Sequence, residues 1–358
     1  MAALDVTLTQ RIAGTVDRAE KWVLRAELAG YLARLGNFEA ARSAIAELRA
    51  VAGWSSARVM AAIMLAEALI ELEDEFATAA VDRLQRGYAI SIAAGHRDQA
   101  AVFAAWLAHA NFNACSFGEM IEWVRKCKSQ GLEEFESAQV RLYLTFADAH
   151  RYVGEFAESE PWYVASRKIA VATGDAAFLA ANMYNRTLYG IARLRLKCVE
   201  DNVEIISTEH LLLEIDSATN YAMATGNRSA RFLQQLCRSR LLMMQGNFVE
   251  AKSLIYEVIA NLPEARHPRL RITFESDIAI CNLHTGCAAL AQRFFEETSD
   301  DVLEVLDADD LAVFLNQRSL ALNATGQVVA ASAARRASLI ALERHDSLAR
   351  QLSGISAA

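Results

Sequence analysis

Residues that break helices are rare in this sequence, and long apolar runs are absent. Only three prolines occur among 358 residues, so helices can continue without interruption. The longest apolar runs, at residues 59–66 and 100–108, are far shorter than the ~20 residues that a membrane-spanning helix needs. Residues 1–11 lack the apolar core of a signal peptide. These absences argue against a membrane partner and predict a cytoplasmic protein.

Cysteine is sparse, and positive charge is outnumbered by negative charge. The six cysteines show no pairing pattern, which in a chain without a signal peptide indicates reduced, buried thiols. The formal net charge is −8, which argues against general affinity for nucleic acid or anionic membranes. Hydrophobic residues make up 53% of the chain, and good helix formers such as alanine dominate, so we expect a helical protein with an ample core.

Signatures of catalysis and of cofactor binding are also missing. The sequence has no glycine-rich phosphate loop, no HExxH, no GxSxG and no CxxC motif, so we expect no catalytic residue and no cofactor. The spacing of Cys281, His284 and Cys287 resembles a metal site, but Gly286 places it at an interhelical turn, and we expect no metal there. His109 and His150 have no nucleophile beside them and are interpreted as packed or surface histidines.

The stretch QGNFVEAK at residues 245–252 has the features of a tight turn between two helices. Gly246 can adopt the left-handed conformation that closes the first helix. Asn247 can accept hydrogen bonds from free amides of the next helix. Ala251 permits close approach of the helices, and Pro263 ends the second helix because it lacks an amide hydrogen. The stretch therefore predicts a helix hairpin.

Variants of this turn recur along almost the whole chain. The aromatic position of the motif falls at residues 38, 76, 117, 156, 248, 288 and 328, in steps of 38, 41, 39, 92, 40 and 40 residues. The long step equals about two periods plus an insertion. A fixed period of roughly 20–50 residues is the signature of a repeat protein. Helix stops such as Gly53, Gly95, Gly131, Gly174 and Gly226 follow most turns by about one helix length.

These features resemble the tetratricopeptide repeat. The resemblance rests on the Gly-Asn-Phe-x-x-Ala turn, on small residues one turn earlier (Ala29, Ala108 and Ala147) and on the Pro263 stop. The period near 40 is similar to the longer repeats of MalT-type regulators, kinesin light chains and bacterial peptide-sensing regulators. The resemblance covers roughly residues 17–345. It implies an all-α fold, a right-handed α-solenoid of about eight antiparallel helix hairpins, with ligands bound on a concave face lined by the first helices.

We expect a single domain throughout residues 1–358. Its expected parts are a leading helix at 4–15, hairpins at 17–53, 56–95, 97–131, 133–174, 175–226, 227–263, 267–306 and 307–344, and a cap at 345–358 with a capping helix near 347–353. Residues 197–208 form an insertion that is either a long loop or a helical extension.

The first helices carry many amide and guanidinium side chains, which predict a binding groove. The candidates are His109, Asn113, Asp148, Arg151, Asn182, Asn185, Arg186, Tyr189, Arg193, Gln234, Gln235, Arg238, Asn316 and Gln317. Residues 186–197 and 228–245 contain no acid. Asparagine can grip a peptide backbone and arginine can bind a carboxylate through two hydrogen bonds, so the expected ligand is an acidic peptide segment or a C-terminal carboxylate. The alternative is that these residues are solvated helix faces.

Acidic residues cluster near the seventh hairpin. They are Glu296, Glu297, Asp300, Asp301, Glu304, Asp307, Asp309 and Asp310. We interpret them as a solvated charge run on the convex face or edge.

Two functions fit the sequence. The first is a non-catalytic scaffold or adaptor that binds a peptide or protein segment in its groove. The second is a ligand-responsive regulatory protein that signals through a separate partner. Self-association through the last hairpin is an open alternative to a cap, because a terminal repeat leaves an apolar face uncovered.

Overall fold

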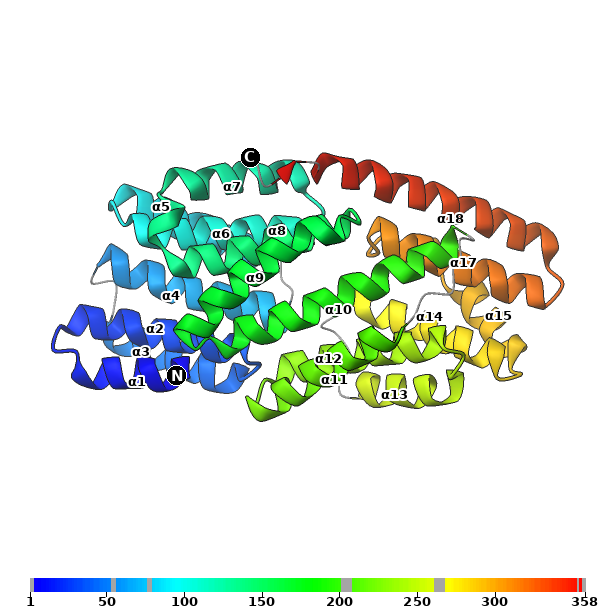
Figure 1. The fold of residues 1–358 in the computed structure, drawn as a ribbon, viewed down its shortest axis with the longest axis horizontal. Helices are drawn as coiled ribbons and strands as arrows, with labels where there is room; N and C mark the ends of the chain where they lie inside the picture. Colours follow the sequence, from blue (N-terminus) through cyan, green and yellow to red (C-terminus); the bar gives the residue numbers. More distant parts are fainter. Residues whose placement is uncertain are drawn as a thin grey trace.

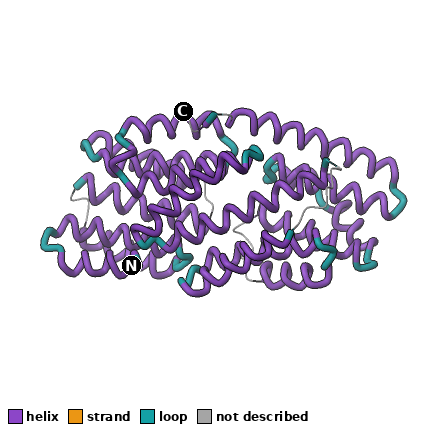
Figure 2. Tube along the Cα trace, viewed as in Figure 1, coloured by secondary structure: helices purple, strands orange, loops and turns teal. Residues whose placement is uncertain are grey.

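In the computed structural model, residues 3–52, 56–75, 79–200, 208–260, 268–352 and 354–355 are described. All regular structure in these ranges is helical and no strand occurs in them (Figure 2), which confirms the expected all-α class. Among the helices of these ranges, none is both long enough and apolar enough to traverse a bilayer. Gly53, Phe76, Pro263, residues 201–207 of the expected insertion and residues 356–358 of the expected cap lie outside the described residues.

The N-terminal half consists of antiparallel helix pairs that follow one another along the chain (Figure 1). Its elements are α1 (Leu4–Gly14), α2 (Arg18–Arg34), α3 (Phe38–Ala52), α4 (Ala57–Ile70), the π-helical η1 (Glu71–Glu75), α5 (Ala79–Ala93), α6 (Arg97–Asn113), α7 (Phe117–Ser129), the 3₁₀-helical η2 (Leu132–Glu134), α8 (Glu136–Tyr152) and α9 (Phe156–Thr173).

The C-terminal half begins with α10, at 24 residues the longest helix in the described ranges. Its elements are α10 (Ala176–Val199), α11 (Glu209–Ala224), α12 (Arg228–Met244), α13 (Phe248–Ala260), α14 (Pro268–His284), α15 (Ala288–Glu297), α16 (Asp300–Leu303), α17 (Ala308–Ala324), α18 (Val328–Ala349) and the 3₁₀-helical η3 (Arg350–Leu352).

The glycine turns have the backbone geometry that the sequence predicts. Gly246 has a φ of 80°, and its amide donates to the Met243 carbonyl while the Asn247 amide donates to the Leu242 carbonyl. This pair of bonds satisfies the last carbonyls of α12 and reverses the chain. Gly36 closes α2 in the same way, with a φ of 79°.

Two helix boundaries bear on the insertion and on the cap. Helix α10 continues to Val199, so the start of the insertion is a helical extension, one of the two expected alternatives. In the described residues 347–352, α18 continues to Ala349 and then tightens into η3, so this part of the expected cap continues α18. The physical reason is that no glycine or proline occurs between residues 328 and 353 to stop the helix.

Successive pairs pack side by side, and their first helices are neighbours. Helix α6 packs on α8, α8 on α10, and α10 on α12. One apolar core extends through the pairs from α2 to α9 and includes the fully buried Phe103, Phe117, Phe146 and Tyr163. Smaller clusters around Phe295 and Ile215 lie in the C-terminal half.

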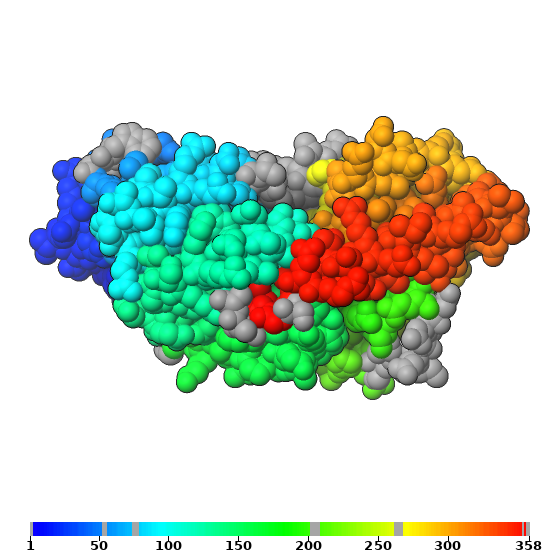
Figure 3. Space-filling model, turned by 90° about the horizontal axis from the view of Figure 1, so that it is seen from above, coloured from blue at the N-terminus to red at the C-terminus, as the bar shows by residue number. Residues whose placement is uncertain are grey.

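Helix pairs that are far apart in the sequence also contact one another. The Arg228 amide donates to the Leu35 carbonyl at 3.0 Å, so the first turn abuts the start of α12. Arg34 forms a two-pronged ion pair with Asp175. Helix α18 runs back over the molecule from the far end, and η3 packs on α7 (Figures 1 and 3).

Candidate functional site

The inner-helix side chains expected to line a groove are mostly withdrawn from solvent. Asp148, Arg151, Asn182, Gln234 and Gln317 are buried; His109, Asn185, Arg186, Tyr189, Arg193, Gln235, Arg238 and Asn316 are half-buried; Asn113 is exposed. Five of these residues take part in two polar networks, namely Asp148, Arg151, Asn185, Arg186 and Gln317, and Asn182 lines a pocket. That they bind a ligand stays a prediction.

The first network centres on the buried carboxylate of Asp148. The Tyr163 hydroxyl donates to its Oδ1 at 2.8 Å, and the Asn185 amide donates to its Oδ2 at 2.7 Å. Arg141, on the same helix, lies 3.8 Å from Oδ2. Burial raises the pKa of Asp148 to about 6, and Arg141 counteracts this rise. The network joins α8, α9 and α10.

An ionic chain continues this network toward α11. Arg151 donates to Glu160 at 2.8 Å, to the Ser159 hydroxyl at 3.2 Å and to the Arg186 carbonyl at 2.6 Å. The guanidinium of Arg186 bridges Glu160 at 3.2 Å and Glu214 at 3.7 Å. These two arginines therefore already have carboxylate partners within the chain.

The second network centres on Asp277 of α14, which is fully buried. It accepts hydrogen bonds from Arg195 of α10 at 2.8 Å, from Arg240 of α12 at 3.1 Å and from Gln317 of α17 at 3.0 Å. Sequence reasoning proposed Gln317 but missed the other three residues. No local signal in the sequence marked them, because Glu275 and Asp277 lie two residues apart and nothing in the stretch shows which of the two is buried.

The acidic run is only partly a solvated surface. Asp310 accepts from Arg269 at 2.9 Å and lies 3.8 Å from Arg195, and Asp307 also pairs with Arg269. Burial raises the pKa of Asp307 to about 6, although Arg269 opposes this rise. The expectation of a solvated charge run is therefore wrong for Asp307 and Asp310, because the start of α17 packs against α10 and α14.

Other predicted residues lie apart from these networks. Asn113 forms a hydrogen bond with His109, at 3.2 Å, on the surface of α6. Arg238 pairs with Asp216, and Asn316 accepts a hydrogen bond from Arg335. Gln234 is buried with both of its amide atoms unpartnered within the described residues. Within the same ranges, no three acidic, histidine or cysteine side chains form a group that could hold a metal ion.

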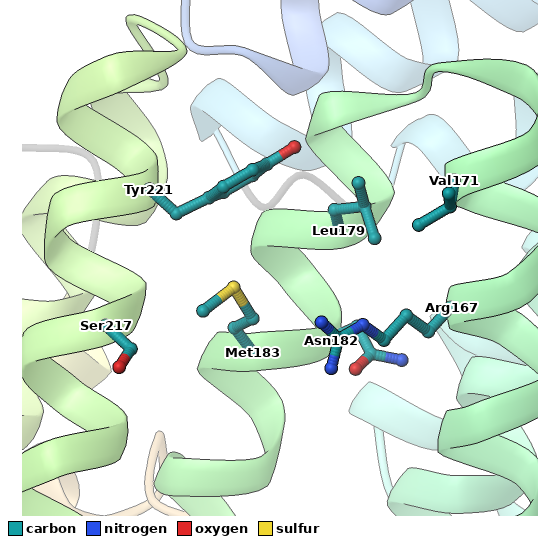
Figure 4. A pocket seen from close by; sticks show the side chains of 7 residues that line it. All are labelled: Arg167, Val171, Leu179, Asn182, Met183, Ser217 and Tyr221. Carbon is teal, nitrogen blue, oxygen red and sulfur yellow. The ribbon is translucent and has the colours of Figure 1, made fainter. Parts of the chain in front are cut away.

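One pocket, with a volume of about 460 Å³, lies over α10 between α9 and α11 (Figure 4). It is lined by Arg167, Val171, Leu179, Asn182, Met183, Ser217 and Tyr221. Leu179, Asn182 and Met183 form its floor, because three- and four-residue steps along α10 return to the same face.

The walls of this pocket differ in character. Val171 and Arg167 of α9 face Tyr221 and Ser217 of α11 across the floor (Figure 4). Arg167 is exposed and makes no ion pair or hydrogen bond within the described part of the chain. Asn182, predicted from the sequence, donates from its amide nitrogen to the Tyr163 carbonyl at 3.0 Å. Within the described residues, the pocket thus combines two apolar side chains and Asn182 at its floor with a cation at its rim, Arg167, that has no ion-pair partner there.

Comparison with protein-family models gives no match to this sequence. Comparison with curated proteins gives no match either. The class to which the chain can be assigned is therefore an all-α protein of antiparallel helix pairs.

Proposed function

We propose that this protein is a non-catalytic interaction module, a right-handed superhelix of tetratricopeptide-like hairpins that binds a peptide or protein segment of a partner. The superhelix is supported by the recurring glycine turns and by the contacts between successive first helices. The binding role is supported by the pocket over α10.

The observation that carries the proposal is the pairing of apolar surface with an uncompensated charge in that pocket. Leu179 and Met183 are half-buried at its floor, and Val171 is 47% exposed on its wall. Arg167 stands beside them without an acidic partner in the described residues. Burial of exposed apolar side chains by a ligand is energetically favourable. A guanidinium without an acidic partner at the rim of a pocket favours acidic ligands.

The ligand that fits is a short segment with an apolar anchor and an acidic group. The anchor would cover Leu179 and Met183, and the carboxylate would accept hydrogen bonds from Arg167. A volume of about 460 Å³ accommodates one or two side chains, so the rest of the segment would lie along the surface of α9 or α11.

The test is selection of peptides from a displayed random library, followed by affinity measurement with fluorescence anisotropy. We expect acidic peptides with an apolar residue to be selected, and Arg167→Glu to weaken them roughly tenfold or more. Arg344→Glu, the same exchange at an exposed arginine of α18 without a partner in the described residues, is the matched control and should leave affinity unchanged. Selected peptides that bind Arg167→Glu and Arg344→Glu with equal affinity would contradict the proposal. So would a selection that yields no binding peptide.

A second candidate, a ligand-responsive regulator, is favoured by the contacts that join distant pairs. The His345 ring nitrogen lies 3.1 Å from the Tyr152 hydroxyl across 193 residues, so α18, which packs along α17, also touches the end of α8. A regulator should change its dimensions in X-ray scattering when a selected peptide is added, whereas a scaffold should keep them.

A further inference from the structure

Helix α18 carries exposed apolar side chains on the face that points away from α17. Its inner face is buried through Ala341 and Leu342, among others, and packs on α17. On the outer face, Val329 is 85% exposed, Ile340 66% and Leu339 39%. Leu339 and Ile340 lie at the middle of the helix, which runs along the surface in the view from above (Figure 3). Exposed apolar side chains grouped on one helix face indicate contact with another chain.

Two opposite charges flank this apolar centre. Arg336 lies three residues before Leu339, and Glu343 lies three residues after Ile340. All four side chains are exposed, and steps of three and four residues place them on one face of α18. The positive, apolar and negative groups therefore follow one another along a single surface stripe.

Neither charge finds a counter-charge on its own helix. Ion pairs along a helix join side chains three or four residues apart. At these distances, Arg336 has no acidic residue and Glu343 has no basic residue. Within the described part of the chain, neither side chain takes part in an ion pair. Both charges are therefore available to a partner that lies along α18.

We propose that α18 is a self-association surface that binds the α18 of a second copy of this chain in antiparallel orientation, separately from the pocket over α10. A twofold axis between Leu339 and Ile340 places Arg336 opposite Glu343 of the second copy, and symmetry repeats this ion pair on the other side. The two apolar centres then cover each other. A parallel arrangement would place like charges opposite one another, so it is disfavoured.

The length and the small side chains of α18 suit this arrangement. The axis between Leu339 and Ile340 lies near the middle of the helix, so two antiparallel copies overlap over most of its 22 residues, about 33 Å. Ser332, Ala333 and Ser347 are exposed on the same face and allow the helices to approach closely. One helix pair buries less than the ~1,200 Å² of a standard interface, so we expect a weak, concentration-dependent dimer.

The test is sedimentation velocity of the full chain at protein concentrations from about 10 µM to about 1 mM. We expect the parent to show a monomer–dimer equilibrium. Arg336→Glu and Glu343→Arg should each raise the Kd of the dimer about tenfold or more, because each places like charges opposite one another twice. An equimolar mixture of these two variants should dimerise about as well as the parent, since every facing pair is then opposite in charge.

Arg25→Glu, the same exchange at an exposed arginine of α2, is the matched control and should leave the Kd unchanged. The exchanged side chains are all exposed, so each variant should keep the Tm of the dilute parent within about 2 °C. A parent that stays monomeric, a dimer that persists in both single variants, or a mixture that dimerises no better than its components would overturn the proposal. Arg167→Glu should dimerise like the parent, which separates this surface from the peptide pocket.

Discussion

Asp148 and Asp277 are both buried carboxylates, yet their surroundings differ at the level of single hydrogen bonds. Asp277 receives direct hydrogen bonds from two guanidinium groups, at 2.8 and 3.1 Å. Within the described part of the chain, Asp148 accepts hydrogen bonds from the neutral donors Tyr163 and Asn185, and Arg141 lies 3.8 Å away. Neutral donors stabilise a carboxylate less than charged ones, so burial dominates at Asp148 and raises its pKa to about 6.

This raised pKa makes the stability of the protein depend on pH in a defined direction. The folded state holds the Asp148 proton more tightly than the unfolded state, whose pKa is near 3.8. The contribution of Asp148 to the free energy of unfolding is therefore fully present below pH 4 and is lost as pH rises through 6. Relative to Asp148→Asn, the parent should lose about 1–2 kcal/mol of unfolding free energy between pH 4.5 and 7.5.

Urea unfolding of both proteins at the two pH values measures this difference. The other carboxyl groups titrate in both proteins and cancel in the comparison, so only Asp148 contributes. A difference that stays constant, or that favours the parent at the higher pH, would contradict the prediction.

At the scale of single elements, the glycine turns are the parts that the sequence specifies most directly. Gly36 and Gly246 both have positive φ, which costs a residue with a Cβ about 1 kcal/mol or more. Their surroundings differ, because a Cβ on Gly246 would meet open space whereas one on Gly36 would lie 2.9 Å from the Ser229 backbone nitrogen.

We therefore expect unequal costs for the same substitution. Gly246→Ala should lower the free energy of unfolding by about 1 kcal/mol, and Gly36→Ala by about 2–3 kcal/mol, because the second also separates the first turn from α12. Chemical unfolding of the two variants under identical conditions gives the comparison. Equal losses of unfolding free energy in the two variants would show that the close approach of Ser229 to Gly36 adds nothing to the cost of Gly36→Ala.

These turns explain why much of the helical pattern could be predicted from sequence. A helix end is encoded locally, by a glycine and its next few neighbours, so α2, α9 and α12 end at the expected positions. The second pair has Glu73 and Asp74 in place of the turn glycine, and there a π-helix, η1, follows α4. The sequence carried no pattern from which that element could be derived.

The candidate sites were predictable only in part, for the same reason. Inner-helix positions could be assigned from the repeat, which identified Asp148, Asn182 and Asn185. The hydrogen bond between Arg195 and Asp277 joins residues 82 apart in the sequence, and nothing local specifies it.

At the scale of the whole molecule, one network of buried charges joins four helices that the apolar clusters join only in smaller groups. The network at Asp277 holds α10, α12, α14 and α17, whereas the apolar clusters of the C-terminal half are small and separate. Removal of the Asp277 charge leaves the buried Arg195 and Arg240 without this counter-charge, and breaking a buried ion pair costs about 3–5 kcal/mol. Neutralisation of this one carboxylate should therefore weaken the packing between the helices of the C-terminal half.

Asp277→Asn tests this directly, with Asp300→Asn as the control because the Asp300 side chain is 90% exposed. We expect Asp277→Asn to lower the unfolding free energy by about 3 kcal/mol and the control by less than about 0.5 kcal/mol. Hydrogen exchange should quicken together in α10, α12, α14 and α17, because Asp277 has partners on the other three helices and asparagine offers one neutral acceptor oxygen in place of two charged ones. Faster exchange confined to α14 would mean that the network serves only its own helix, and that apolar packing alone holds the four helices together.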